Sequence, residues 1–437
     1  MEGNNVQLGT ATNHYTDYPV ALSPSARLRH TFILGQTGTG KTTLLQNLAV
    51  QDLIEGEGFA FFDPHGDASH ELLDFIPPHR MRDVVYLRPA DTVRAFGYNI
   101  LSNVPEKERD RVTQEVVATF RYRWADSWGA RMENIFKHAV RALLDAPARH
   151  GGATLLSVPL LLNRKQYRAW VLKHCDNRAV RDFFTYEFDA WNQRQLAEFV
   201  QPILNKVDQF LLSDAIRNVI GQAQSTIDLE YMMNNRKVLI LDLDKGAIGQ
   251  DDANTIGSLL LTGFQLAAMR RSKVPLNERV PFYCYLDEFH SFTTGSFASI
   301  MSESRKYGLG LVLAGQYLDQ IEIDQVKASV FGNCGNFCSF RVSNADAQAI
   351  AQTLEQRPAL LEDLPNGHAA VKYLRDGHPK TERISTRLLD PHNRSDRSRK
   401  VIRYAERFTT PTKEIDARLV KWLGFVEEPQ GRESSKK

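Results

Sequence analysis

The sequence predicts an α/β fold in which a mostly parallel sheet carries helices on both faces and an all-α domain is inserted into the sheet. Short apolar, β-branched or aromatic runs end at turn or acidic residues, as buried parallel strands do. Amphipathic helical stretches alternate with these runs. The length of 437 residues exceeds that of a usual single domain and favours two lobes or one core with a large insertion.

Seven runs are predicted as strands of this sheet: 31–34, 59–62, 84–87, 237–241, 280–286, 309–313 and 336–342. Helical patterns lie between several of them. One example follows the fourth run, where Ile256, Leu259, Leu260 and Phe264 are spaced for one buried face of a helix. Alternation of this kind predicts a parallel sheet that is covered on both sides.

One stretch breaks the alternation and predicts the inserted domain. Residues 105–235 are almost wholly helical in pattern, in the runs VTQEVVATFRYRW, MENIFKHAVRALLDA, LLSVPLLLNRKQYRAWVLKH and 191–220. Residues 372–407 differ again, because they hold 11 Lys and Arg against 5 Asp and Glu, which is typical of a solvated tail. The expected organisation is an N-terminal extension (1–28), an α/β domain in two parts (29–103 and 236–390), the all-α domain (104–235) and a basic C-terminal tail (391–437).

Composition excludes some classes of protein. The hydrophobic fraction of 42% and the charged fraction of 24% are ordinary for a globular protein, and a net charge of +2 gives no indication of partners. Four cysteines without a second ligand pair at zinc-finger spacing are expected to be reduced thiols. No apolar run reaches the roughly 18 to 20 residues that cross a bilayer, so we expect a cytoplasmic protein without direct membrane insertion.

The strongest motif is GQTGTGKT, which begins at Gly35, fits G-x4-G-K-[ST], follows the apolar run TFIL and opens a helical pattern. Its glycines let backbone N–H groups surround phosphate oxygens, and the helix N-terminus adds a favourable dipole. Lys41 would contact the β and γ phosphates, and Thr42 would offer a hydroxyl to Mg²⁺. The predicted nucleotide-binding residues are Gly35, Gln36, Thr37, Gly38, Thr39, Gly40, Lys41, Thr42 and Thr43.

A phosphate-binding loop needs a second strand that presents a carboxylate to the metal. The run VPFYCYLDEF ends in Asp287 and Glu288, and two adjacent acids at a buried strand end are costly unless they are used. Asp287 is predicted to hold Mg²⁺, and Glu288 to orient and deprotonate the attacking water. The run LILDLD, with Asp242 and Asp244, is a second candidate that ranks lower because no acid directly follows either aspartate.

Three further side chains are candidate catalytic residues. The run LGLVLAGQ ends at Gln316, whose amide could sense the γ-phosphate or the lytic water. The strand predicted at 336–342 carries Arg341, and Arg305 precedes the LGLVLAG run. Either arginine could reach the phosphates of a neighbouring subunit.

Five motifs in one order carry a resemblance to a known family. The order GQTGTGKTTLL, FFDPHGD, YLDEF, SRKYGLGLVLAGQ and SFRVSNADA resembles the FtsK-HerA superfamily of ring-forming P-loop motors. Within it, the chain is most similar to the soluble ATPase part of conjugative type IV coupling proteins of the TraD/TraG kind. The resemblance covers about residues 29–405 and includes an all-α domain before the run KVLILDLD.

The resemblance implies a RecA-like ATPase that binds ATP and Mg²⁺, forms a hexameric ring and translocates DNA. By position, Lys41 and Thr42 match the family's Walker A motif, Asp287 and Glu288 its Walker B motif, and Gln316 its sensor glutamine. Arg305 and Arg341 match family positions for the arginine that completes a neighbour's site. His65, in the DPHG signature, would shape a turn or assist catalysis beside the nucleotide. Coupling proteins usually begin with transmembrane helices, which this chain does not display, so membrane secretion is less strongly expected.

Other functions remain open at this point. A protein-handling secretion ATPase or an NTP-dependent oligomeric scaffold without DNA translocation is the main alternative, and a P-loop kinase or GTPase-like switch is a third. Asn205 to Asp208 fit the guanine-specificity pattern N-K-x-D, but the match lies within the helical insertion. Single-stranded and double-stranded DNA are both compatible with the motifs, and residues 245–252 and 291–296 are candidate DNA-contacting loops. The helical domain and the basic tail could bind a protein partner.

Overall fold

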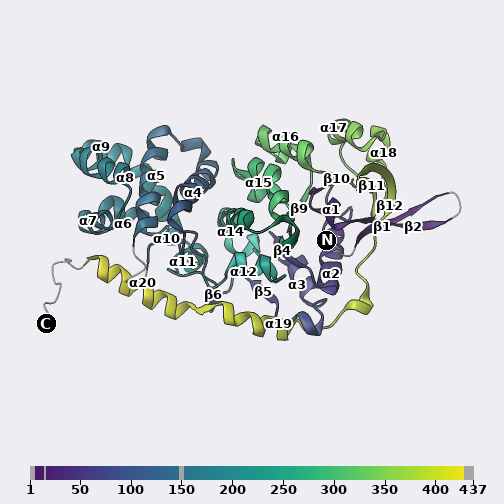
Figure 1. Cartoon of the computed structure of the whole chain (residues 1–437), viewed down its shortest axis with the longest axis horizontal. Coiled ribbons are helices and arrows are strands. Elements are labelled where there is room, and N and C mark those ends of the chain that lie inside the picture. The colour runs from purple at the N-terminus through teal and green to yellow at the C-terminus, as the bar shows by residue number, and fades with distance from the viewer. Residues whose placement is uncertain (1–4, 14–15, 147–151, 428–437) are drawn as a thin grey trace. The chain divides into compact units, whose positions relative to one another are not determined.

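The computed structural model describes residues 5–13, 16–146 and 152–427 (Figure 1). Contacts divide the chain into two compact units. Unit 1 consists of Met1–Arg88 and Leu229–Ala405, and unit 2 consists of Pro89–Asp228 and Glu406–Lys437. Parts of the predicted extension (1–4 and 14–15), of the predicted insertion (147–151) and of the predicted basic tail (428–437) lie outside the described residues.

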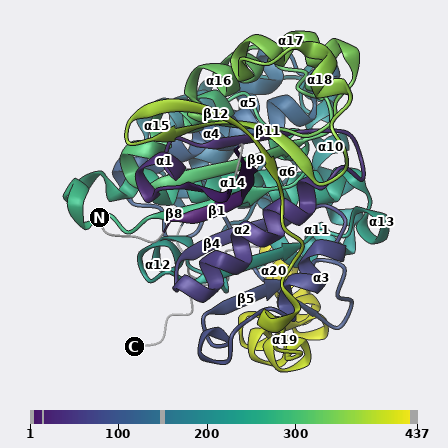
Figure 2. The same cartoon turned by 90° about the vertical axis from the view of Figure 1, so that its right-hand side faces the viewer.

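Unit 1 contains an 11-stranded sheet, seen in both orientations in Figures 1 and 2. Its order is β2 (Asp17–Leu22), β1 (Val6–Thr12), β12 (His378–Ser385), β11 (His368–Arg375), β10 (Asn336–Ser339), β3 (Thr31–Leu34), β9 (Leu309–Gly315), β8 (Phe282–Leu286), β4 (Gly58–Asp63), β7 (Val238–Asp242) and β5 (Val84–Leu87). The seven strands from β10 to β5 are parallel, and each coincides with a predicted run to within two residues at its start. The prediction of a mostly parallel α/β sheet is therefore confirmed.

The other four strands extend the sheet on the β10 side and were not predicted. β11 pairs antiparallel with β10 and with β12, and β1 pairs antiparallel with β12 and β2. The first two strands come from the segment expected to be an N-terminal extension. Their apolar side chains Val6, Leu8, Val20 and Leu22 are buried in the core of unit 1.

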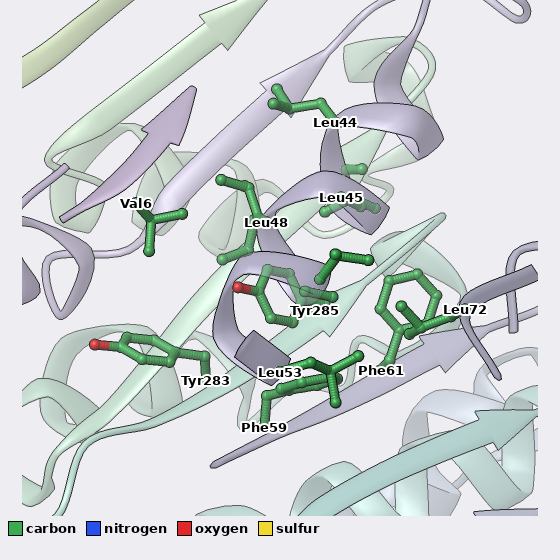
Figure 3. Packing of buried hydrophobic residues seen from close by; sticks show 14 of the residues in the cluster. Val6, Leu44, Leu45, Leu48, Leu53, Phe59, Phe61, Leu72, Tyr283 and Tyr285 are labelled. Carbon is green, nitrogen blue, oxygen red and sulfur yellow. The ribbon is translucent and has the colours of Figure 1, made fainter. Parts of the chain in front are cut away.

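Helices cover both faces of the parallel strands, as the sequence predicts. On one face, leucines of α2 (Lys41–Glu55) lie against the aromatic rings of β4 and β8 (Figure 3). On the other face, Phe264 of α14 (Gln250–Arg270) contacts Phe62 and Phe282, with ring centroids 6.3 and 5.3 Å away. Successive β4 side chains point to opposite faces, so Phe61 and Phe62 belong to different layers. The remaining α-helices of unit 1 are α1 (Pro24–Arg27), α3 (Asp67–Leu73), α12 (Leu229–Asn234), α13 (Lys245–Ile248), α15 (Phe297–Glu303), α16 (Asp324–Asn333), α17 (Asn344–Leu354), α18 (Pro358–Glu362) and α19 (Ser398–Ala405).

A buried polar network joins α1, α2 and β8. The Arg27 guanidinium donates to both carboxylate oxygens of Asp52, at 2.8 and 2.6 Å, and the Tyr285 hydroxyl donates to Asp52 at 2.6 Å. Arg27 also stacks over the Tyr283 ring, 3.4 Å from its centroid. Burial acts to lower the pKa of Arg27, but the Asp52 charge outweighs it and raises the pKa above its ordinary value. The Arg27 guanidinium therefore stays charged inside the core against which α2 packs.

Unit 2 is helical apart from a two-stranded ladder of β6 (Arg94–Ala95) and β13 (Thr410–Pro411), among the residues described there. The predicted helical runs form helices, and the run 191–220 is divided among three of them. The division before α11 has a local cause, because the Ser213 side chain accepts from Ile216 N and caps a new helix. The α-helices are α4 (Arg109–Arg123), α5 (Ala130–Asp145), α6 (Ser157–Asn163), α7 (Lys165–Lys173), α8 (Arg178–Asp182), α9 (Gln193–Phe199), α10 (Gln201–Leu212), α11 (Asp214–Ile220) and α20 (Thr412–Glu427).

An aromatic cluster fills the centre of unit 2. The Phe120 ring lies 4.8 Å from Trp124, 5.3 Å from Phe136 and 5.5 Å from Phe210, centroid to centroid. These rings come from α4, α5 and α10 and the residue after α4, so they tie distant helices together.

Over the described stretches of the chain, no helix has both the length and the apolar character that crossing a membrane requires. All four cysteines are buried free thiols.

Candidate functional site

The phosphate-binding loop connects β3 to α2 and is shaped by glycines. Gly38 (φ 76°) and Gly40 (φ 118°) adopt left-handed backbone conformations that other residues rarely take. The Thr39 hydroxyl donates to the Gln36 carbonyl at 2.7 Å, and the Lys41 ammonium donates to the same carbonyl at 2.8 Å. The lysine is thus folded back over the loop, with its charge above the cradle where phosphate oxygens would lie.

Lys41 is 7% exposed, so its ammonium is largely removed from water. Burial lowers its pKa below the ordinary value, while the charges of Asp287 and Glu288 act in the opposite direction. A buried ammonium whose hydrogen-bond partner is a neutral carbonyl is only partly compensated. An anion in the loop would supply the missing charge, which suits Lys41 to a phosphate.

Asp287 lies directly after β8 and reaches the start of α2. The Thr42 hydroxyl donates to Asp287 Oδ2 at 2.8 Å. Burial raises the pKa of Asp287, the Thr42 hydrogen bond opposes this rise, and the Asp63 charge adds to it. The pair offers one carboxylate and one hydroxyl oxygen, which are ligand types that Mg²⁺ prefers, and a bound cation would stabilise the buried carboxylate. Thr42 and Asp287 therefore fit a magnesium ion.

Glu288 receives hydrogen bonds on both carboxylate oxygens. Gln316 Nε2 lies 2.8 Å and His65 Nε2 lies 3.1 Å from Oε1, and Lys245 Nζ donates to Oε2 at 2.6 Å. Burial acts to raise the pKa of Glu288, but the hydrogen bonds from Lys245 and His65 and their charges lower it below the ordinary value. The residue takes a left-handed backbone conformation, with φ of 45°, which is strained for a glutamate.

Gln316 follows β9, which lies between β3 and β8. Its Nε2 binds Glu288, and its Oε1 accepts a hydrogen bond from the Thr37 hydroxyl at 3.2 Å. The glutamine thus joins the phosphate loop to the acidic strand end. Beside it is a cavity of about 470 Å³ lined by Gln36, Thr37, Gln316, Tyr317, Asp319, Ser343, Ala345 and Asp346.

The second acidic candidate lies elsewhere on the sheet. Asp242 ends β7, which is separated from β8 by β4. Its Oδ2 accepts from the Tyr86 hydroxyl at 2.6 Å and lies 3.5 Å from Arg88 Nε, and burial raises its pKa. Asp244 pairs with Arg88 at 3.3 Å. These aspartates hold β5 and β7 together, whereas Asp287 contacts the phosphate loop.

The two candidate arginines lie at opposite ends of the parallel strands. Arg341 follows β10; its carbonyl accepts from Gln36 N at 2.9 Å, and its guanidinium donates to Asn366 Oδ1 at 3.1 Å. Arg305 is exposed and precedes β9, at the amino ends of the parallel strands. The phosphate loop is at their carboxyl ends, so Arg305 does not lie at the loop of its own chain.

The sequence gives no signal for the contact between Lys245 and Glu288, because Lys245 is there only the first residue of a candidate DNA-contacting loop. Of the two loops considered, 291–296 includes Ser291, Thr293 and Thr294, whose exposed fractions are 7%, 2% and 2%. Buried side chains cannot contact DNA in this conformation. The N-K-x-D match lies within α10, where Asn205 accepts from Gln201.

The chain was compared with known proteins. The family model described as type IV secretion-system coupling protein DNA-binding domain matches residues 16–358. A curated relative, the type 4 coupling protein DotL of Legionella pneumophila subsp. pneumophila, is 22% identical to this chain, and the match covers 66% of this chain and 44% of the relative. The chain therefore spans less than half the length of that relative.

Solved structures share the fold. The plasmid coupling protein TrwB in complex with the GTP analogue GDPNP has a TM-score of 0.62 at 17% identity, covering 85% of this chain and 88% of that one. The same protein with ADP and Mg²⁺ has a TM-score of 0.61 at 16% identity, covering 85% and 88%. VirB4 of Thermoanaerobacter pseudethanolicus has a TM-score of 0.55 at 11% identity, covering 90% and 98%.

Proposed function

Because this chain belongs to the family of type IV secretion-system coupling protein DNA-binding domains, we propose that it hydrolyses ATP and uses the energy to move DNA. The ATPase part of the proposal rests on the side chains at one sheet edge. The DNA part rests on the family, whose description names DNA binding. TrwB, which shares the fold, was solved with nucleotide analogues and with ADP and Mg²⁺.

One observation carries the ATPase proposal. The carboxyl ends of β3, β9 and β8 are neighbours, and hydrogen bonds join Thr37 to Gln316, Gln316 to Glu288 and Thr42 to Asp287. A loop that cradles phosphate, a carboxylate near a hydroxyl, and a second carboxylate beside an amide are the parts that phosphoryl transfer to water needs. They converge within hydrogen-bond distance of one another.

Each residue has a role that its position supports. Lys41 would neutralise charge on the β and γ phosphates, and the loop from Gly35 to Thr43 would surround them with N–H groups. Thr42 and Asp287 would hold Mg²⁺, which supplies Lewis-acid polarisation of the phosphate oxygens when bound. Glu288 would accept the proton of the attacking water, and Gln316 would orient that water.

Assembly is the second part of the proposal. We propose a homohexameric ring in which Arg341 or Arg305 of one subunit completes the site of its neighbour. The position of Arg305 favours this arrangement, because Arg305 lies at the end of the parallel strands opposite the phosphate loop of its own chain. Repeated head-to-tail contacts between subunits close into rings. Within the chain, we propose an ATPase domain (29–103 and 236–390) that works with an all-α domain (104–235), and that the latter or the basic tail (391–437) binds a protein partner.

The test is steady-state hydrolysis of ATP and of GTP by the full chain with no nucleic acid, with single-stranded DNA and with duplex DNA. Lys41→Ala is the negative control. We expect hydrolysis above the control, a preference for ATP and stimulation by at least one form of DNA. A rate equal to that of Lys41→Ala under every condition refutes the ATPase proposal.

Two other outcomes separate the alternatives. Hydrolysis that neither form of DNA changes refutes DNA translocation and supports a protein-handling ATPase. Native mass spectrometry with ATP should detect hexamers. Monomers in every nucleotide state, with and without DNA, would refute the ring.

A further inference from the structure

The hydrogen bonds around Glu288 occupy three of the roughly four acceptor positions of its carboxylate, which restricts its action as a base. A general base must direct an unshared oxygen lone pair at the water that it deprotonates. Here Oε1 binds the Gln316 amide and His65, and Oε2 binds the Lys245 ammonium at 2.6 Å. The glutamate and lysine side chains are 11% and 23% exposed, so this ion pair is only partly screened by water. Lys245 is the strongest of these restraints because it carries a full charge at the shortest distance.

Lys245 lies beside exposed residues, where a ligand from outside the protein could reach it. It begins the four-residue helix α13 after β7, and the following Gly246, Ala247 and Gly249 are exposed. The preceding Asp244 is fixed on two sides, by Arg88 at 3.3 Å and by Ala247 N at 3.3 Å. The Lys245 backbone N–H also donates to the Pro64 carbonyl at 2.9 Å. With the backbone held, the side chain can exchange partners by rotation alone.

A phosphate oxyanion is the ligand that would compete for this ammonium. Lysine binds phosphate as a point charge, and nucleic-acid backbones present closely spaced phosphates to proteins through such contacts. We propose that Lys245 is a positioning residue that restrains Glu288, and that a DNA phosphate contacting α13 takes over the lysine and releases the glutamate for catalysis. The inference rests on the proposed function and adds to it the link between DNA binding and hydrolysis.

The experiment compares Lys245→Met with wild type in the full chain, by measuring kcat and KM for ATP with and without DNA. Methionine is unbranched like lysine and only one atom shorter, and it removes the charge. We expect the kcat without DNA to rise about fivefold or more, equivalent to a barrier lower by about 1 kcal/mol. KM for ATP should stay within about twofold, since Lys245 does not touch the phosphate loop. Stimulation by DNA should fall toward onefold, and Lys245→Arg should restore both the low basal rate and the stimulation.

The matched control is Lys237→Met. Lys237 lies at the amino end of the same strand and pairs with Asp83 at 2.5 Å, and its side chain is 25% exposed, close to the 23% of Lys245. It is remote from Glu288, because β7 separates the two ends. We expect Lys237→Met to keep the wild-type basal rate and the wild-type stimulation by DNA. That result would show that losing a half-buried ion pair does not by itself cause the effect of Lys245→Met.

The outcomes separate this inference from the proposed function. A Lys245→Met rate that falls with and without DNA would mean that the lysine takes part in chemistry, and an unchanged rate would mean that it restrains nothing; either refutes the inference. A wild-type rate that DNA does not change refutes DNA translocation and the release step together, whereas DNA stimulation that Lys245→Met retains in full refutes the release step alone. If wild type hydrolyses no faster than Lys41→Ala, the proposed function itself fails. Thermal melting of each variant establishes that it is folded, and Lys245→Gln replaces Lys245→Met if the latter is not.

Discussion

Glu288→Gln tests the assignment of the base most directly. The change keeps the size of the side chain and one oxygen that can accept from Gln316 and His65. The other terminal atom becomes an amide nitrogen that faces the Lys245 ammonium, so the ion pair is lost together with the base. Lys41, Thr42 and Asp287 are unchanged, so we expect ATP affinity to stay within a few fold.

Hydrolysis should collapse. A positioned general base contributes roughly 10²- to 10⁴-fold to a rate. We therefore expect kcat to fall by about that factor, which corresponds to about 3 to 5 kcal/mol of barrier. A change of partner at Lys245 should have no effect on hydrolysis by this variant, because the glutamine amide accepts no proton from water.

The assay has two parts. Single-turnover hydrolysis with excess protein measures the chemical step, and equilibrium binding of ATP measures nucleotide affinity. Because ATP persists, the variant should also accumulate as a nucleotide-loaded ring that holds DNA, with an affinity that falls steeply as salt rises. Hydrolysis within tenfold of the wild-type rate would refute the base assignment. Retention of ATP without DNA binding at low salt would refute the motor.

Three further changes test other parts of the molecule. Asp287→Asn should weaken Mg²⁺-dependent ATP binding by at least roughly 10- to 100-fold, the loss in metal affinity seen when a residue that supports a metal ligand is removed. Unchanged magnesium dependence in a titration would exclude Asp287 as a ligand. Lys41→Ala should abolish ATP binding or hydrolysis, and wild-type turnover in the same assay would reject the phosphate-loop assignment. Asp52→Asn leaves the Arg27 charge buried without its partner, so it should destabilise unit 1 by about 3 to 5 kcal/mol and lower Tm by roughly 6 to 20 °C; a scan with no shift would contradict the buried ion pair.

The central strands could be predicted because they are buried on both faces. All six residues of β4 are buried, and its sequence GFAFFD is a nearly continuous apolar run. The antiparallel strands gave no such signal. β12 has the sequence HPKTERIS with only Ile384 buried, so its charges look like those of a solvated segment. Charged side chains are usual on strands with one exposed face, and composition alone does not separate such a strand from a tail.

The residues of the site differ in the same way. The residues of the phosphate loop are adjacent in sequence and follow β3, and Asp287 and Glu288 are adjacent in sequence and follow β8. A local pattern therefore identifies each group. The contacts of Glu288 are not local, because Lys245 is 43 residues away in sequence and His65 is 223. Sequence predicts that residues after parallel strands share one edge of a sheet. It does not give the strand order, which decides which of them touch.

That strand order has a consequence for how DNA binding could reach the nucleotide. The neighbouring strands β3, β9, β8, β4 and β7 present the phosphate loop, Gln316, Glu288, His65 and Lys245 in turn. Thr37 binds Gln316, Gln316 binds Glu288, and Glu288 binds both His65 and Lys245, so the side chains form one continuous line along the carboxyl edge. Lys245 at the far end lies beside exposed residues of α13, and Thr37 at the near end belongs to the loop in which the γ-phosphate is proposed to lie. A change of partner at Lys245 therefore needs only the Glu288 carboxylate and the Gln316 amide to relay it to the phosphate loop, along a single sheet edge and without any movement of one domain against another.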